Sequence, residues 1–249
     1  MEKTQKQKLT DFLINNGVII VMFILVIYTG LTTKNFLTAD NGMNLLANMS
    51  YRLVIALGIA GCVITAGCDL SAGRMIGFGA CLAGTLLQKA DYSGRFFQSE
   101  PWASMGNGIL LKISPMNPFV VLFLVMLICA LFGTITGWFI AYLSVPPFIA
   151  TLAMMEIIYG LGLLYTNIES YTIFSTGKFL GLSYLIWIAL LMAALTWFIF
   201  NMTRHGKYMY AIGGNPQAAE VAGVPVNLTL VLIYAKAAAF YGMAGYMPP

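Results

Sequence analysis

Apolar residues in this chain gather in seven runs that polar segments separate. The runs cover about 12–31, 46–66, 75–87, 118–143, 147–165, 180–200 and 228–247. A helix crosses the ~30 Å hydrocarbon core of a bilayer with about 20 apolar residues, so only the run 75–87 is clearly short. Lipid offers the backbone no hydrogen bonds, so such runs cross it as helices. The pattern predicts an all-α polytopic membrane protein with about seven transmembrane helices.

Composition supports a membrane protein, because 59% of the residues are hydrophobic and only 9% are charged. A soluble domain carries about 25% charged residues. The net charge of +4 is small and lies in the polar segments, so it indicates orientation rather than nucleic-acid binding. The cysteines show neither metal-ligand spacing nor a disulfide framework, and we interpret them as small buried hydrophobes. They are Cys62, Cys68, Cys81 and Cys129.

Basic residues predict the orientation of the spans. Lysines precede the first run, which is too long for a signal peptide and lacks a small-residue cleavage site, so we expect an uncleaved anchor. Positive residues favour the cytoplasm, which places the N-terminus inside. Every even-numbered span then ends inside, together with Arg74, Arg204 and Lys207. The longer segments 89–117 and 166–179 fall outside.

A polar island separates the last two runs and predicts a short cytoplasmic helix within 201–227. Asn215 can cap free N–H groups, and Pro216 suits the first helical position. Gly223 supplies a left-handed stop. The helix carries small side chains on adjacent faces: Ala218, Ala219 and Ala222. A segment that only connected two spans would not need these features, so we expect a soluble partner here.

A second polar interruption lies between the second and third runs, at 67–74. Gly67 can end the second span, and Asp69 or Ser71 can accept N–H groups at the start of the third. The favoured interpretation is a capped tight turn. The alternative is that Asp69, Ser71 and Gly73 shape the cytoplasmic mouth of a pathway. No second titratable group is spaced to work with Asp69, so we do not assign it a catalytic role.

Three motifs identify a resemblance to bacterial sugar ABC importer permeases. Residues 58–74, GIAGCVITAGCDLSAGR, resemble the family's G-x-DLS-x-G stretch. Residues 145–152, VPPFIATL, resemble its P-F-I-x-T-L element, and 203–223 resemble its T-R-x-G … A-I-G-G-N-x-x-A-A … G segment. The motifs occur in the family's order, and the resemblance covers essentially the whole chain. Within the ribose, xylose and galactose branch, the likeness is greatest to the galactose/methyl-galactoside permeases.

The resemblance implies a permease subunit that moves a monosaccharide, galactose or methyl-galactoside by the nearest likeness, across the inner membrane. Its partners would be a second permease copy, a cytosolic ABC ATPase and an extracytoplasmic sugar-binding protein. ATP and Mg²⁺ would bind to the ATPase, and this chain would hold no cofactor, metal or catalytic site. The residues expected to couple to the ATPase are Arg204, Gly206, Gly213, Gly214, Asn215, Pro216, Ala218, Ala219 and Gly223.

The chain also departs from the family. The resemblance implies about ten spans, so we expect 1–249 to be a single permease domain that is incomplete at its C-terminus. Glu156 and Lys236 lie inside runs, at positions where we expect apolar or small residues. An ionisable group inside a membrane suggests a function by default. The two can pair with each other, face the pathway or reflect a diverged sequence, and the sequence does not choose.

Two other function classes stay open. An ion-coupled secondary transporter would use Glu156 and Lys236, but it favours inverted repeats with broken helices, and no matching halves occur. An intramembrane enzyme is the weakest alternative, because the only histidine is His205 and no Gly-Lys-Ser phosphate loop or metal cluster occurs. Position alone makes a few polar residues pathway candidates: Asn44, Asn48, Tyr51, Thr65 and Tyr159.

Two small-residue pairs predict close helix packing. Gly133 and Gly137 are four residues apart on the fourth run, as are Ala238 and Gly242 on the seventh. Small residues at this spacing let two membrane helices approach closely. We expect ordinary packing here rather than a subunit interface.

Overall fold

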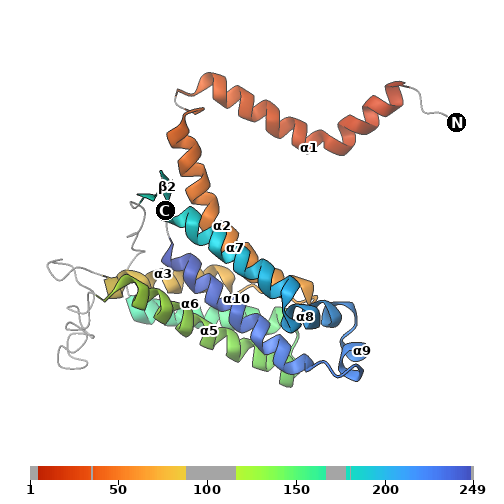
Figure 1. Cartoon of the computed structure of the whole chain (residues 1–249), viewed down its shortest axis with the longest axis vertical. Coiled ribbons are helices and arrows are strands. Elements are labelled where there is room, and N and C mark those ends of the chain that lie inside the picture. Colours follow the sequence, from red (N-terminus) through yellow and green to blue (C-terminus); the bar gives the residue numbers. More distant parts are fainter. Residues whose placement is uncertain (1–4, 35, 88–115, 167–177, 180, 248–249) are drawn as a thin grey trace. The chain divides into compact units, whose positions relative to one another are not determined.

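A computed structural model describes residues 5–34, 36–87, 116–166, 178–179 and 181–247 (Figure 1). The described part is almost entirely helical, and its only strands form a two-residue antiparallel pair. The strands are β1 (Lys178–Phe179) and β2 (Leu182–Ser183). The helices are α1 (Gln5–Thr32), α2 (Ala39–Ile64), α3 (Ala72–Leu87), α5 (Pro118–Tyr142), α6 (Pro147–Thr166), α7 (Tyr184–Met202), α8 (Arg204–Gly214), α9 (Pro216–Val221) and α10 (Val226–Tyr246).

Each of the seven apolar runs coincides with a helix, which confirms the predicted all-α membrane architecture. Among the described residues, α2, α5, α7 and α10 are long and apolar enough to cross a membrane. The other three contain shorter apolar stretches, at Asn16–Thr32, Ala72–Leu87 and Pro147–Leu163. The chain is therefore a multi-pass membrane protein, and the count of seven crossings stays a prediction.

The chain divides into two compact units, Met1–Leu46 and Ala47–Pro249, which we describe separately. The first unit consists of α1 and the start of α2. Large apolar side chains are exposed along α1, with Val18 87% and Leu31 83% exposed. A helix that is apolar on all sides is stable only inside a protein core or in lipid. Within its own unit, α1 therefore carries the all-round apolar surface that suits lipid or a protein core.

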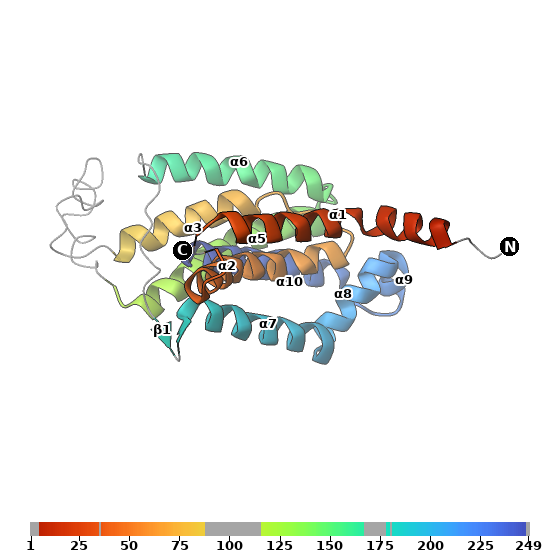
Figure 2. The same ribbon diagram turned by 90° about the horizontal axis from the view of Figure 1, so that it is seen from above.

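The second unit is built around α10, which packs against both α5 and α3 (Figure 2). Glycines allow the closest approach, since Gly133 lies against the backbone of Tyr234. At Gly137, an added side-chain carbon would lie 2.8 Å from the Cα of Val231. The small-residue pairs thus pack within the chain, as expected. This close crossing fixes α10 as the core helix.

Hydrogen bonds show which helix ends share a side of the second unit. The amide of Met116, just before α5, donates to the carbonyl of Leu86 at the end of α3 (3.1 Å). The Tyr246 hydroxyl, at the end of α10, donates to the carbonyl of Pro118 at the start of α5 (3.2 Å). Helix α5 therefore runs opposite to α3 and α10, in agreement with the predicted alternation of spans.

Candidate functional site

Residues 65–71 connect α2 to α3 as a non-helical stretch that we call the re-entrant segment. Ala66 ends α2 in the left-handed conformation (φ 55°). The next amide, of Gly67, donates to the carbonyl of Cys62, five residues earlier (2.8 Å). This is the outer hydrogen bond of a Schellman-type helix end. The sequence predicted that Gly67 ends the helix. In the structure, its lack of a side chain also leaves room for the Tyr234 hydroxyl. An added side-chain carbon there would lie 2.6 Å from the hydroxyl of Tyr234.

The expected capping is present, because the Asp69 carboxylate accepts from the Ser71 amide, and the re-entrant segment also contacts α10. Gly67 meets Tyr234, and the Asp69 carboxylate meets Tyr241. At 1.5 Å per residue, these two tyrosines lie about 12 and 23 Å along α10 from its start, whereas Cys68, between the two contacts, lies against Thr151 only about 6 Å along α6 from its start. Non-helical backbone between membrane helices is stable only where protein or water satisfies it.

The Asp69 carboxylate holds the segment against α10. One oxygen accepts from the Ser71 amide (3.0 Å) and from its hydroxyl (2.7 Å), and the other accepts from the Tyr241 hydroxyl (3.0 Å). Asp69 is half-buried and Ser71 is 3% exposed. Three donors on one carboxylate compensate for taking its charge out of water. Sequence reasoning missed Tyr241, because a tyrosine in an apolar run carries no signal of a polar partner elsewhere.

The three sequence motifs meet at the re-entrant segment. The first motif contains the segment. In the second, the buried hydroxyl of Thr151 lies 3.5 Å from the carbonyl oxygen of Cys68. In the third, Gly213 of α8 packs against the carbonyl of Ile64, where any side chain would collide. Segments far apart in the sequence thus converge on one non-helical stretch.

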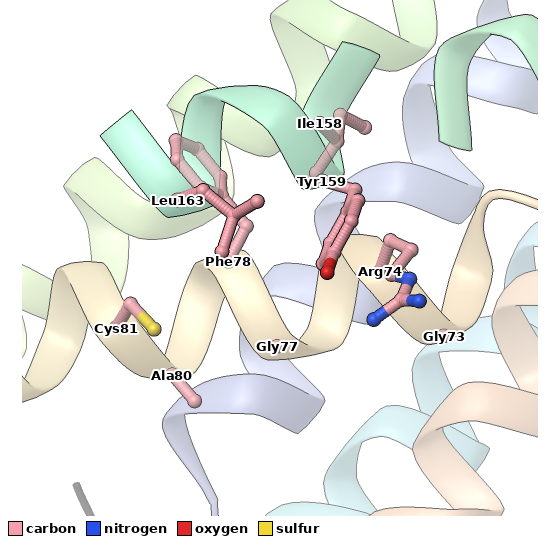
Figure 3. A pocket seen from close by; sticks show the side chains of 10 residues that line it. Gly73, Arg74, Gly77, Phe78, Ala80, Cys81, Ile158, Tyr159 and Leu163 are labelled. Atoms are coloured by element: carbon pink, nitrogen blue, oxygen red, sulfur yellow. The ribbon is translucent and has the colours of Figure 1, made fainter. Parts of the chain in front are cut away.

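A cavity of about 300 Å³ lies between α3 and α6, beside the end of the re-entrant segment (Figure 3). The guanidinium carbon of Arg74 lies 4.1 Å from the ring centre of Tyr159, a cation–π contact. Tyr159 is about 18 Å along α6 from its start, so the Arg74 side chain contacts the middle of that helix. The predicted cytoplasmic location of Arg74 stays a prediction. Gly73 is exposed and lines the cavity.

Among the five polar pathway candidates, only Tyr159 lines this cavity. The Thr65 hydroxyl donates to the carbonyls of Gly61 and Cys62 at the end of its own helix. Asn44, Asn48 and Tyr51 lie on α2, outside the residues that line the cavity. Helical position alone therefore did not identify the residues that come together.

The two unexpected charges do not pair within the described parts of the chain. The Lys236 ammonium is buried, lacks a hydrogen-bond partner there, and lies 4.2 Å from the ring centre of Phe200. Glu156 is exposed on α6. One of the open interpretations, a Lys236–Glu156 pair, is therefore excluded in this conformation.

The polar island forms two helices, α8 and α9, which we call the α8–α9 arm. The Asn215 side chain caps α9 by accepting from the amide of Ala218 (3.0 Å), Pro216 begins the helix, and Gly223 is left-handed (φ 83°). These features confirm the predicted short helix. Helix α8 was not predicted; Thr203 caps it by accepting from the Gly206 amide (3.3 Å).

The nine predicted coupling residues separate into an exposed and an inward-facing set. The exposed ones are Arg204, Gly214, Asn215, Pro216, Ala218 and Gly223. Gly206 packs against the carbonyl of Phe200, and Gly213 against that of Ile64. Ala219 is only 5% exposed, so it packs inward and does not present a face to a partner as expected. The large exposed apolar residue of α9 is Val221, which is 91% exposed and was missed.

His205 is the titratable group of the arm with a displaced pKa. Burial lowers its pKa below the ordinary value, and the nearby charge of Lys236 lowers it further. The shift favours the neutral imidazole, and the His205 side chain is half-buried on α8.

Comparison with known proteins agrees with this architecture. Residues 41–248 match the family described as branched-chain amino acid transport system / permease component. The galactose/methyl galactoside import permease of Escherichia coli K12 is 37% identical, over 99% of this chain and 74% of the relative.

Further relatives extend the comparison. The Haemophilus influenzae protein of the same name is 39% identical over the same shares. The ribose import permease of H. influenzae is 29% identical over 98% of this chain and 71% of the relative. No solved structure matches significantly. The resemblance carried by the three motifs is confirmed, and the chain belongs to this family of transmembrane permeases.

Proposed function

We propose that the chain is the permease subunit of an ATP-driven importer that moves galactose or methyl galactoside into the cytoplasm. The relatives named for these sugars are 37% and 39% identical, whereas the one named for ribose is 29% identical. The proposed partners are an extracytoplasmic sugar-binding protein, a second copy of this chain and a cytosolic ATPase. ATP and Mg²⁺ belong to the ATPase in this proposal.

The observation that carries the proposal is the α8–α9 arm. Its outer face includes α9, a capped six-residue helix whose Val221 side chain is almost fully exposed. A large apolar side chain that is exposed on a polar segment suits a protein interface better than water. The arm leads into α10 after four residues, 222–225, so a partner that moves α9 also moves the core helix.

The arm and the core helix α10 each make a contact at or beside the re-entrant segment. Gly213 packs against Ile64, directly before the segment, and α10 holds Asp69 through Tyr241. A rigid-body displacement of the arm would therefore act on the start and the middle of the segment together. Packed elements of this kind switch between discrete arrangements. We infer that ATPase movement opens and closes the pathway at the segment.

A second copy is supported by the exposed carboxylate of Glu156 on α6. An acidic side chain near the middle of a bilayer costs about 2.5–3.5 kcal/mol on insertion scales. Packing of α6 against a partner chain, or against a water-filled pathway between two copies, removes that cost. In the same proposal the N-terminus and the arm lie on the cytoplasmic side, as basic residues favour.

Co-purification with the ATPase tests the proposal. Ala218→Glu and Val221→Glu place a charge on the exposed face of α9 without disturbing the buried Ala219. We expect the native permease to recover the ATPase from mild detergent and both variants to lose it. Transport of galactose by the variants would fall in parallel.

Ala39→Glu is the matched control, because Ala39 is exposed at the far end of α2 from Ile64. It should recover the ATPase at the native level. ATPase recovery by all three variants would contradict docking on α9. Failure of the folded native permease to recover any ATPase would favour a secondary transporter, and Glu156 and Lys236 would then be the residues to mutate.

A further inference from the structure

The cavity between α3 and α6 has the chemistry of a small-molecule site. Its volume of about 300 Å³ is at the lower end of the range for such sites. Two aromatic rings, one guanidinium and several glycines line it (Figure 3). The residues that matter for the argument are Gly73, Arg74, Gly77, Phe78, Tyr159 and Gly162.

Arg74 is the strongest indication that the cavity holds a polar ligand. An arginine near the middle of a bilayer is costly on every scale, so it is retained where it faces a partner or a water-filled space. Arg74 is exposed, and its contact with Tyr159 leaves its N–H groups available, since a ring face accepts no conventional hydrogen bond. A neutral ligand rich in hydroxyl groups supplies the missing acceptors.

The remaining lining suits the apolar face of a sugar ring. Tyr159 and Phe78 come from facing helices, and aromatic rings pack against such faces while polar groups fix orientation. Among the described residues, no atom lies within 4 Å of the position that a side-chain carbon would take at Gly73, Gly77 or Gly162. A ligand can therefore approach the backbone of α3 and α6 closely.

We propose that this cavity is a transit site where the monosaccharide binds between the Arg74 guanidinium and the Tyr159 ring during its passage. The inference rests on the proposed function and adds the site within it. The cavity adjoins the re-entrant segment, because Ser71 and Arg74 are one helical turn apart. Movement of the segment would change the position of Arg74 and release the sugar, so the site binds weakly and transiently.

Uptake by the assembled importer provides the first test, with galactose delivered by its binding protein. Tyr159→Leu removes the ring and with it both the surface proposed to pack on the sugar and the cation–π contact with Arg74, so it should lower the uptake rate about tenfold. Tyr159→Phe keeps the ring and should stay within about threefold of the native rate. Arg74→Gln should lower the uptake rate by about the same factor as Tyr159→Leu. Trp138→Leu, on an exposed face of α5, is the control and should transport normally.

Cys81 gives a direct measure of occupancy, because it lines the same cavity. Cys62 and Cys129 are buried, so Cys68→Ser leaves Cys81 as the accessible thiol among the described residues. A small methanethiosulfonate reagent should modify Cys81 more slowly when the importer is turning over galactose. Mannitol at the same concentration should not slow it. Tyr159→Leu should abolish the protection while ATPase recovery stays native.

Three outcomes separate this inference from the proposed function. Native uptake in both Arg74→Gln and Tyr159→Leu would overturn the transit site and leave the permease assignment intact. Modification of Cys81 that depends on lipid or detergent but is equal with and without galactose would also overturn it, and would indicate a lipid pocket. Failure of the native importer to transport galactose at all would instead contradict the proposed function.

Discussion

A single carboxylate organises the most unusual backbone of this chain. Asp69 receives hydrogen bonds from the Ser71 amide and hydroxyl and from the Tyr241 hydroxyl. A half-buried charge is stable only when donors replace water, and here two donors are local and one comes from the core helix. Tyr241 is therefore the residue that connects the re-entrant segment to α10.

Tyr241→Phe removes only the hydroxyl and leaves the packing of a fully buried ring. One carboxylate oxygen of Asp69 then loses its donor, which should destabilise the protein by about 1–3 kcal/mol. Thermal unfolding in detergent measures the change. Tyr246→Phe is the matched control, because its hydroxyl donates to a backbone carbonyl at an exposed position, and it should cost clearly less. Equal losses in the two variants would contradict the role of Tyr241.

At the scale of elements, the crossing of α5 and α10 determines the core. Gly133 and Gly137 bring α5 against the backbone of α10, and α10 is the most buried of the span-length helices described, at 61% of its apolar window. In a membrane this approach replaces the hydrophobic effect as the source of stability between helices, because lipid is as apolar as the side chains.

Gly133→Ala tests the crossing. The added methyl group would lie 2.5 Å from the Cβ of Ala238 and against the carbonyl of Tyr234, so the helices must separate. Overpacking of this kind costs about 1–3 kcal/mol. Gly17→Ala on α1 is the control, since no atom of the described part of the chain lies within 4 Å of the new carbon. A lower unfolding temperature in detergent for Gly133→Ala alone is the expected result.

How much the sequence predicts depends on the range of the interactions. Apolar length predicted all seven long helices, and capping chemistry predicted α9 from Asn215 to Gly223, because both are local. The contact of residues 65–71 with α10 was not predicted, since a capped turn and a re-entrant stretch share the same polar residues and differ only in a contact with Tyr241. Ala219 was placed on the wrong face for the same reason, because the helix alone does not say which side is covered.

At the scale of the whole molecule, the alternation of helix directions requires the arm and the start of α5 to lie on opposite sides of the membrane. Val221→Cys and Asn117→Cys, each with Cys68 and Cys81 replaced by serine, place one thiol at each exposed position. An impermeant maleimide added to intact cells should label only the Asn117→Cys variant. Labelling of the Val221→Cys variant from outside would reverse the proposed orientation.

The Asp69–Tyr241 hydrogen bond joins two residues that are far apart in the sequence. This separation constrains the order in which the parts of the protein can fold during synthesis. The two residues are 172 positions apart, so the carboxylate leaves the ribosome well before its partner does. At about 5–20 residues per second, the interval is roughly 10 to 30 s. During that time the Asp69 carboxylate lacks the donor that holds it against α10. The hairpin of α2 and α3 must therefore settle after α10 is inserted, which makes early spans depend on a late one during biogenesis.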